Sequence, residues 1–352
     1  MLKKLSAILM SAALAVTMCG CNNGSTSGNS RTDTPSSVQS SDTESTPNNV
    51  SAGTGSFKVD GTKLLDANGN EFVMRGINHA HTWFRDNLDD ALNGIAKTGA
   101  NCVRIVLSDG DQWEKIPADE FETVVNKCLE HKMVVIAELH DGTGKEEIGY
   151  IDNAVEYWIE MKDILNAHTD TVILNIANEW VGKWDSDNWK KGYTSAIPKL
   201  REAGIKNTIM VDAAGWGQYG ESIKQAGKAV FDSDPDKNTI FSIHMYGSAG
   251  KNAKTIKSNL TGVTDQDLCV VVGEFGYTHS DGDVNEVYIM KYCTENNIGY
   301  IGWSWKGNGG GVEYLDLAKD WLGEQLSEDW GEVLINGENG IKATAKVCTV
   351  FE

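Results

Sequence analysis

Two glutamates of this 352-residue chain, Glu179 and Glu274, stand where carboxylates could do chemistry as a pair. Each follows a run of apolar residues and precedes an aromatic one, Trp180 or Phe275. Removing a carboxylate from water is costly unless the group has partners or a task. Retaining glycosidases use two such groups ~5–5.5 Å apart, an acid whose pKa is raised and an ionised nucleophile. The alternative is a pair of salt-bridged glutamates without a catalytic role.

The elements that must position these glutamates are eight short β-rich runs with helical stretches between them. The runs comprise residues 72–78, 102–107, 133–140, 171–178, 208–212, 239–244, 269–274 and 299–303. Their nearly continuous apolar character is typical of buried parallel strands. Apolar residues recur at helical spacing in residues 88–98, 121–131, 154–167 and 287–296. This alternation predicts an α/β fold, a (β/α)8 TIM barrel, which needs ~250 residues. No GxGxxG motif follows the first run, which disfavours a dinucleotide-binding fold.

Polar and aromatic residues follow the predicted strands, at the barrel end where active sites form. They are Asn78, His79, Arg104, His140, Asn178, Glu179, His244, Tyr246, Glu274, Trp303 and Trp305. Any one of these polar side chains alone would more often have a structural role, with its hydrogen bonds made inside the fold. Their joint placement at one end of the barrel indicates an active site. Strands four and seven lie on opposing sides of an eight-stranded barrel, so Glu179 and Glu274 can face each other across its mouth.

Three motifs resemble glycoside hydrolase family 5 of clan A: Asn178-Glu179, Gly-Glu-Phe-Gly at 273–276 and Trp-Ser-Trp-Lys-Gly-Asn at 303–308. The similarity runs from about Phe57 to Phe351. Within the family, residues 74–81, 212–219 and 242–246 are most similar to bacterial endo-β-1,4-mannanases. The resemblance implies a retaining hydrolase that cleaves β-1,4-mannosidic bonds inside mannan, glucomannan or galactomannan without a cofactor.

The same resemblance implies roles for individual residues. Glu179 is expected to be the acid/base and Glu274 the nucleophile. Asn178 should hydrogen-bond the 2-hydroxyl of the sugar under attack. Arg104 should lie near Glu274 and help to keep it ionised. Tyr246 is expected to hydrogen-bond the nucleophile.

Further site residues complete the expected cleft. His244 should orient the acid/base or the sugar, His140 should line the same subsite, and Trp303 should stack on the sugar at the cleavage point. Five tryptophans that follow strands are candidates for neighbouring subsites, with helix or loop packing as the alternative: Trp83, Trp113, Trp184, Trp216 and Trp305. Trp158 lies in a helical stretch, where core packing is expected.

The sequence is also compatible with other functions. An endo-β-1,4-glucanase (a cellulase) would use the same mechanism. A non-catalytic glycan-binding lipoprotein that feeds a transporter predicts the loss of one glutamate, and both are present. The formal net charge of −19 argues against nucleic acid as a partner. His79 and His81 lack a third ligand at metal spacing, so we expect no catalytic metal, although calcium on Asp281 and Asp283 stays possible.

The first 55 residues predict export. Residues 1–21 combine Lys3 and Lys4 with a short apolar run and Cys21, which predicts a signal peptide of the lipoprotein type with a lipid on Cys21. Ordinary signal cleavage and free secretion are the alternative. Residues 22–55, rich in Ser, Thr and Gly, predict a disordered linker. Residues 56–352 are the expected catalytic domain, a monomer held outside the membrane only by the lipid.

Two further expectations concern cysteines and loops. The five cysteines beyond the signal region show no metal-binding spacing, and we expect no structural disulfide. Residues 247–250 and the glycines at 309–311 depart from the mannanase pattern, which leaves the outer subsites open.

Overall fold

The structure is a computed structural model that describes residues 55–352. The predicted signal peptide, its lipid site at Cys21 and the linker up to residue 54 therefore lie outside the described residues. Among the described helices, none is long and apolar enough to cross a membrane.

Eight parallel strands form a closed barrel in the order β12-β3-β4-β5-β6-β7-β8-β9. They are β3 (Arg75–His79), β4 (Cys102–Leu107), β5 (Val134–Leu139), β6 (Val172–Asn175), β7 (Ile209–Asp212), β8 (Thr239–Met245), β9 (Val270–Phe275) and β12 (Gly299–Gly302). Every one of these strand residues is buried, which explains why the runs read as continuously apolar. The predicted (β/α)8 TIM barrel is confirmed.

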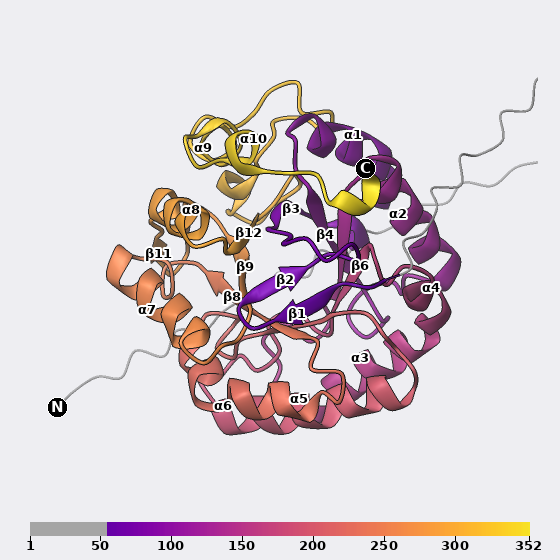
Figure 1. Ribbon diagram of the computed structural model, residues 1–352. Coiled ribbons are helices and arrows are strands. Elements are labelled where there is room, and N and C mark those ends of the chain that lie inside the picture. The colour runs from indigo at the N-terminus through magenta and orange to yellow at the C-terminus, as the bar shows by residue number, and fades with distance from the viewer. Residues whose placement is uncertain (1–54) are drawn as a thin grey trace, which may run out of the picture. The chain divides into compact units, whose positions relative to one another are not determined.

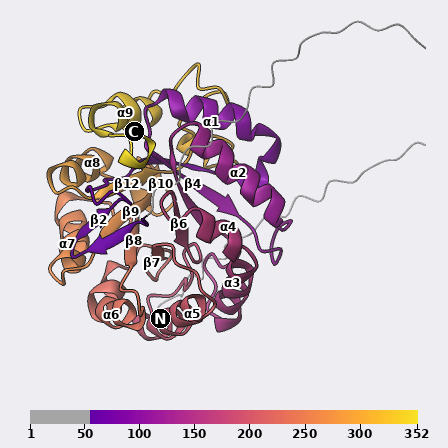
Figure 2. The same cartoon turned by 45° about the vertical axis from the view of Figure 1, so that its right-hand side comes forward.

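Helices surround the barrel, as Figure 1 and the turned view in Figure 2 show. They are α1 (Leu88–Lys97), α2 (Ala118–Glu130), α3 (Ile148–Glu160), α4 (Lys162–Ala167), α5 (Ser186–Glu202), α6 (Gly220–Ser233), α7 (Ala253–Thr264), α8 (Glu286–Glu295), α9 (Gly331–Asn336) and α10 (Ile341–Thr344). The single helix expected over 154–167 is two helices, because Met161 leaves helical geometry with a ψ of 2°. Asp185 caps α5 by accepting hydrogen bonds from the backbone N–H groups of Asp187 and Asn188.

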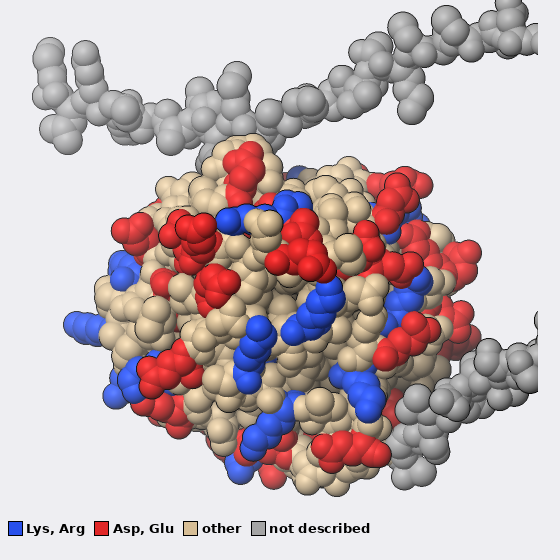
Figure 3. Space-filling model, turned by 90° about the horizontal axis from the view of Figure 1, so that it is seen from above, with Lys and Arg blue, Asp and Glu red and all other residues tan. Residues whose placement is uncertain are grey.

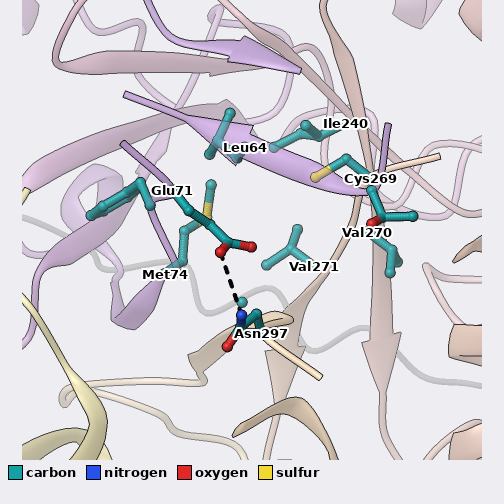
Figure 4. Close-up of a pocket in the computed structure, with 11 residues that line it drawn as sticks. Leu64, Glu71, Met74, Ile240, Cys269, Val270, Val271 and Asn297 are labelled. Atoms are coloured by element: carbon teal, nitrogen blue, oxygen red, sulfur yellow. Dashed lines mark hydrogen bonds between the residues drawn. The ribbon is translucent and has the colours of Figure 1, made fainter. Parts of the chain in front are cut away.

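The amino-terminal end of the barrel is closed by apolar packing. A hairpin of β1 (Lys58–Asp60) and β2 (Lys63–Leu65) crosses this end and lies in front of the barrel in Figure 1. Figure 4 shows the pocket there, lined mainly by apolar side chains such as Leu64 and Ile240, with one hydrogen bond between Asn297 and Glu71 at its edge. This end stabilises the fold, and the chemically active groups lie at the opposite end.

All five cysteines of the described chain are buried, and none is paired with another. They are Cys102, Cys128, Cys269, Cys293 and Cys348. Burial raises the pKa of the thiols, for example to about 12 for Cys293, which keeps them protonated and unreactive. On the face seen in Figure 3, acidic and basic side chains are interspersed.

Candidate active site

The centre of the site is Arg104, which points from β4 into the carboxyl end of the barrel and is fully buried. Its Nη1 atom donates to Oε1 of Glu274 at 2.7 Å and to Oδ1 of Asn78 at 3.0 Å. Its Nη2 atom donates to Oδ1 of Asn178 at 2.7 Å and to Oδ1 of Asn175 at 2.9 Å. One planar cation thus orients side chains from β3, β6, β9 and the loop after β6.

Glu274, at the end of β9, is held by two donors on its two oxygens. Besides the contact from Arg104, the hydroxyl of Tyr246 donates to Oε2 at 2.9 Å. The side chain is almost fully buried, with 3 % of the residue exposed. Both hydrogen bonds fix the orientation of the carboxyl group toward the barrel mouth.

Glu179, in the loop after β6, has a different environment. Burial raises the pKa of its carboxyl, although the hydrogen bond with His244 opposes the shift. Nδ1 of His244 lies 2.7 Å from Oε1 of Glu179. The backbone φ of Glu179 is +45°, a left-handed conformation that is uncommon outside glycine. Asp212 stabilises this turn, because its Oδ2 atom accepts the backbone N–H of Glu179 at 3.1 Å.

The two glutamates face each other closely. One carboxylate oxygen of each lies within 4.8 Å of the other and of a ring nitrogen of His244. Inverting glycosidases need room for a water between carboxyl groups ~6.5–9.5 Å apart, whereas retaining ones place them at ~5–5.5 Å. The observed spacing fits direct attack by one carboxylate on a sugar.

The same three residues are close enough together to surround a metal ion, but their protonation does not suit one. Burial lowers the pKa of His244, yet the carboxylates of Glu274 and Asp212 outweigh burial and raise it to about 10. A doubly protonated imidazole has no lone pair to offer a metal. The cluster therefore suits proton transfer.

Asn178 and His140 lie next to the glutamates. Asn178 accepts from Arg104 and donates from Nδ2 to Oγ1 of Thr143 at 2.9 Å. Nδ1 of His140 lies 3.0 Å from Oε1 of Glu138. Burial lowers the pKa of His140, but Glu138 outweighs it and the net shift is upward.

An aromatic group lines one side of the mouth. The ring of Trp303 stacks on that of His140, with centroids 5.8 Å apart and an interplanar angle of 25°. Trp83 meets His140 edge-on at 5.2 Å and Trp113 at 5.1 Å. Trp83 belongs to the 3-10 helix η1 (His81–Trp83) and is 37 % exposed. These rings follow β12, β3, β4 and β5, where a sugar could stack.

The structure corrects the predicted position of Trp305. The sequence predicts it beside the cleft, but its side chain is fully buried and its indole N–H donates to the carbonyl of Trp321 at 2.8 Å. A Cβ atom added at Gly94 or at Gly323 would clash with its ring, so the indole fills a close-packed gap. A strand-end position does not reveal that this side chain turns inward. Trp158 is buried as expected, with its N–H on the carbonyl of Ile176.

Trp216 and Trp184 lie elsewhere on the rim and are 47 % and 58 % exposed.

The structure shows the surroundings of the glycines in the two loops that depart from the mannanase pattern. A Cβ at Gly247 would lie 2.5 Å from the backbone of Asp281, so the chain there must be glycine. At the glycines of 309–311, an added Cβ would have no atom within 4 Å, so this loop borders open space.

Three site residues were not among those that the sequence predicts. Asp212 ends β7, contacts Glu179, and lies 3.4 Å from Nη2 of Arg104. Asn175 ends β6, and Glu138 lies inside β5; both are buried. The sequence does contain a signal for them, since a lone polar residue inside a buried strand requires a partner. The roles assigned to the predicted site residues stay predictions.

Comparisons with known proteins agree with this geometry. A sequence model described as Cellulase (glycosyl hydrolase family 5) matches residues 65–309. A mannan endo-1,4-beta-mannosidase of Salipaludibacillus agaradhaerens is 53% identical over 295 residues, which cover 84% of this chain and 96% of that protein. A beta-mannanase structure from Thermomonospora fusca superposes with a TM-score of 0.81 at 40% identity, covering 85% of this chain and 100% of that one. A beta-mannanase from Streptomyces thermolilacinus, solved with mannohexaose, gives a TM-score of 0.80 at 37% identity, with 85% and 99% covered. The chain belongs to glycosyl hydrolase family 5.

Proposed function

We propose that this protein is an endo-β-1,4-mannanase that hydrolyses mannan, glucomannan or galactomannan with retention of configuration. The observation that carries the proposal is the close pair of unlike carboxyl groups, Glu179 and Glu274, at the mouth of the barrel. The mannan substrate is supported by the relatives that are named mannanases.

In the first step, Glu274 attacks the anomeric carbon while Glu179 protonates the leaving oxygen. Arg104 and Tyr246 hold the attacking carboxylate in place. The raised pKa of Glu179 favours its protonated form, which the acid role requires. The product of this step is a glycosyl ester on Glu274 and a free sugar chain that departs on the Glu179 side.

In the second step, Glu179 acts as a base and water attacks the ester carbon. The carboxylate that Glu179 has become is stabilised by the protonated ring of His244 at 2.7 Å. Asn178 shares the guanidinium of Arg104 with Glu274, and we expect it to hydrogen-bond the 2-hydroxyl of the bound sugar. Two displacements at one carbon return the original β configuration.

The test is a product assay with purified residues 56–352 on mannan, glucomannan, carboxymethyl cellulose and xylan. We expect short manno-oligosaccharides, a β anomer as the first product by NMR, and roughly 10²–10⁴-fold slower turnover in Glu179→Gln. Activity on cellulose alone would keep the mechanism and replace mannan by β-glucan as substrate. Inactivity on all four polymers would support the glycan-binding alternative.

The acid/base assignment has a sharper control. An aryl mannobioside with an acidic phenol needs little protonation on departure, so Glu179→Ala should lose much less activity on it than on mannan. Added azide should then restore turnover and give a β-mannosyl azide, because the ester on Glu274 still forms. Glu274→Ala should be inactive on both substrates. The reverse pattern would exchange the two roles.

We further propose that the chain is exported, lipid-anchored at Cys21 outside the membrane, and monomeric. The support for export and for the lipid anchor is the sequence of residues 1–21 alone. Full-length protein expressed in bacteria should enter the detergent phase, and Cys21→Ser should move it to the aqueous phase or medium. Wild-type protein in the aqueous phase would favour ordinary signal cleavage. Light scattering of residues 56–352 should give the mass of one chain.

A further inference from the structure

Thr143 lies in the turn after β5, close to the reacting groups, and the two displacement steps give it no task. Its backbone N–H donates to the carbonyl of His140 at 3.1 Å. Its hydroxyl donates to the same carbonyl at 2.6 Å. A hydroxyl has a single hydrogen, and this bond uses it. Toward any other group, the Oγ1 atom of Thr143 therefore acts only as an acceptor.

The group that Thr143 accepts from is the side-chain amide of Asn178. Nδ2 of Asn178 donates to Oγ1 of Thr143 at 2.9 Å, although the two residues are 35 positions apart in the chain. Capping of its own turn explains why the Thr143 hydroxyl binds a carbonyl three residues earlier. Capping does not explain the second bond, which joins the turn after β5 to the loop after β6. Thr143 therefore acts beyond its own turn.

Arg104 and Thr143 together hold the amide of Asn178 at both of its ends. Nη2 of Arg104 donates to Oδ1 of Asn178 at 2.7 Å. A guanidinium offers donors only, and the Thr143 oxygen offers a lone pair only, so the oxygen and nitrogen of the amide cannot exchange places. The two contacts fix the plane of the amide. One hydrogen of Nδ2 points at Thr143, and the direction of the other hydrogen is fixed with it.

The second hydrogen of Asn178 Nδ2 stays available for a sugar. The nearest acceptor to consider is Nε2 of His140, which lies 3.4 Å from Nδ2. Burial lowers the pKa of His140, but Glu138, 3.0 Å from Nδ1, outweighs burial and raises it. This shift favours the doubly protonated ring, whose Nε2 carries a hydrogen and has no lone pair to accept one. His140 therefore leaves the second N–H of Asn178 without a protein partner.

Main-chain hydrogen bonds hold the turn after β5 in place without the help of the Thr143 hydroxyl. The N–H of Gly144 donates to the carbonyl of Glu179 at 3.1 Å, and the N–H of Val181 donates to the carbonyl of Lys145 at 2.9 Å. These bonds connect the residues that follow Thr143 to the loop that carries the acid/base. Removing the hydroxyl therefore leaves the two loops joined and mainly releases the amide of Asn178.

The direction of the free N–H matters because of the sugar group that it is expected to meet. A hydrogen bond to the 2-hydroxyl of the sugar under attack becomes stronger in the transition state of glycoside hydrolysis. Such a bond lowers the barrier only if its donor is already aimed correctly, and small displacements of a positioned group reduce the rate strongly. The residue that fixes the donor therefore influences turnover without touching the sugar.

We propose that Thr143 is a positioning residue, which aims the free N–H of Asn178 at the 2-hydroxyl of the sugar at the cleavage point. The proposal rests on the retaining mannanase function proposed above. Thr143 acts only through Asn178, so its contribution to the rate depends on the presence of the 2-hydroxyl. A residue that merely stabilises the turn would contribute equally with and without that hydroxyl.

The test uses an aryl β-mannobioside and its analogue that lacks the 2-hydroxyl on the sugar next to the aryl group. For each substrate, kcat/KM of the variant is divided by that of wild type, which cancels the difference in intrinsic reactivity. In Thr143→Val, which keeps the shape but not the hydroxyl, we expect a fall of about 10-fold on the mannobioside. On the 2-deoxy analogue the change should be less than about twofold. Thr143→Ser, which keeps the hydroxyl, should recover most of the loss.

Thr98→Val is the matched control, because Thr98 makes the same two kinds of hydrogen bond between α1 and the start of β4. Its hydroxyl donates to the carbonyl of Ile95 at 2.6 Å and accepts the N–H of Ala100 at 3.2 Å. Thr98→Val should leave kcat/KM unchanged on both substrates at a temperature where it is folded. In a protein that already carries Asn178→Ala, adding Thr143→Val should cause no further loss, since the group that Thr143 positions is gone.

Equal losses on the two substrates in Thr143→Val would overturn the proposal, because they would show general support of the loop. Unchanged values on both substrates, or a further loss on top of Asn178→Ala, would overturn it as well. Thermal unfolding of each variant shows the temperature range in which it is folded. If wild type cleaved an aryl β-cellobioside and not the mannobioside, the mannan assignment would fail, and the corresponding pair of cellobiosides would test Thr143 in the same way.

Discussion

Oδ2 of Asp212 lies 3.5 Å from Nε2 of His244, whose other ring nitrogen lies 2.7 Å from Oε1 of Glu179. The histidine is therefore sandwiched between two carboxyl groups, with a third, Glu274, 3.6 Å from Nδ1. Burial would raise the pKa of Asp212, but His244 and Arg104 hold it well below its usual range. A permanent negative charge on Asp212 thus supports a positive charge on His244, which in turn supports the ionised form of Glu179 during catalysis.

Replacing Asp212 by Asn should create a new alkaline limit on turnover. Without the carboxylate, His244 loses its proton at lower pH, and the Glu179 carboxylate formed in the first step loses its charged partner. We expect kcat on mannan to fall on the order of tenfold near pH 8, with a smaller fall near pH 5. Asp234→Asn is the matched control, because Asp234 is a buried aspartate paired with Arg201 outside the site. A profile of unchanged shape in Asp212→Asn would contradict this role.

The stability of the protein should depend on the His244 proton. Its folded pKa of about 10 exceeds the ordinary value of 6.5. The stabilisation is therefore complete below about pH 6.5 and is lost as pH rises through about 10. Urea unfolding at pH 6 and pH 9 should show a fall in the free energy of unfolding, and the fall should be smaller in Asp212→Asn. The buried cysteines contribute equally to the pH dependence of both proteins. The difference between wild type and Asp212→Asn in the fall of unfolding free energy therefore reports on His244.

Arg104→Lys should damage both stability and catalysis, although it keeps the charge. The guanidinium satisfies acceptors on Asn78, Asn178 and Glu274 at once, which a lysine ammonium cannot do from one position. Leaving buried carboxylates with incomplete partners typically costs about 3–5 kcal/mol. Denaturant unfolding and kcat/KM on mannan measure the two effects. A variant that is as stable as wild type would show that the network tolerates a point charge.

Trp305→Ala separates packing from substrate binding. Because the indole is fully buried, its removal should lower the free energy of unfolding by about 3–5 kcal/mol. KM for mannan should stay near the wild-type value at a temperature where the variant is folded. A large rise in KM with unchanged stability would instead restore the sugar-stacking role expected from the sequence.

Asp281→Asn should loosen the rim around Tyr246. Asp281 lies in a hairpin of β10 (Thr278–His279) and β11 (Gly282–Asp283) and accepts hydrogen bonds from the N–H groups of Gly247 and Ser248 at 2.9 Å and 2.8 Å. These donors and Gln218 all bind the carboxylate of Asp281, so we expect the side chain to act as a loop clamp rather than as a calcium ligand.

The clamp should act through Tyr246, whose ring contacts that of His279 at 4.7 Å. We expect kcat on mannan to fall a few-fold in Asp281→Asn, because the phenol is less well oriented on Glu274. The pKa of Asp281 is held well below 3.8, so its stabilising contribution is present above that pH and is lost as pH falls. The difference between the melting temperatures at pH 3 and at pH 6 should therefore be smaller in Asp281→Asn than in wild type. Added calcium should leave the melting temperature of wild type unchanged, and a calcium-dependent increase would contradict the clamp.

The sequence by itself determined the barrel, because a closed parallel sheet buries both faces of every strand and so imposes eight apolar runs at regular intervals. It also determined the position of the polar strand ends, since all parallel strands end on the same rim. Glu179, Glu274 and His244 lie at or next to that rim for this reason, whereas Arg104 is the third residue of β4 and reaches them from inside the barrel. Which residue has which catalytic role came from family resemblance and not from the pattern.

Tertiary structure alone decided which side chains turn toward the cleft. Trp305 follows β12 just as Trp303 does, yet one indole fills a gap beside Gly94 and the other lines the mouth. Asp212 resembles an ordinary strand end in the sequence, and only the approach of β6, β7 and β8 brings it against Glu179 and His244. Side-chain direction and pKa depend on distances between residues remote in sequence, and local patterns contain no measure of those distances.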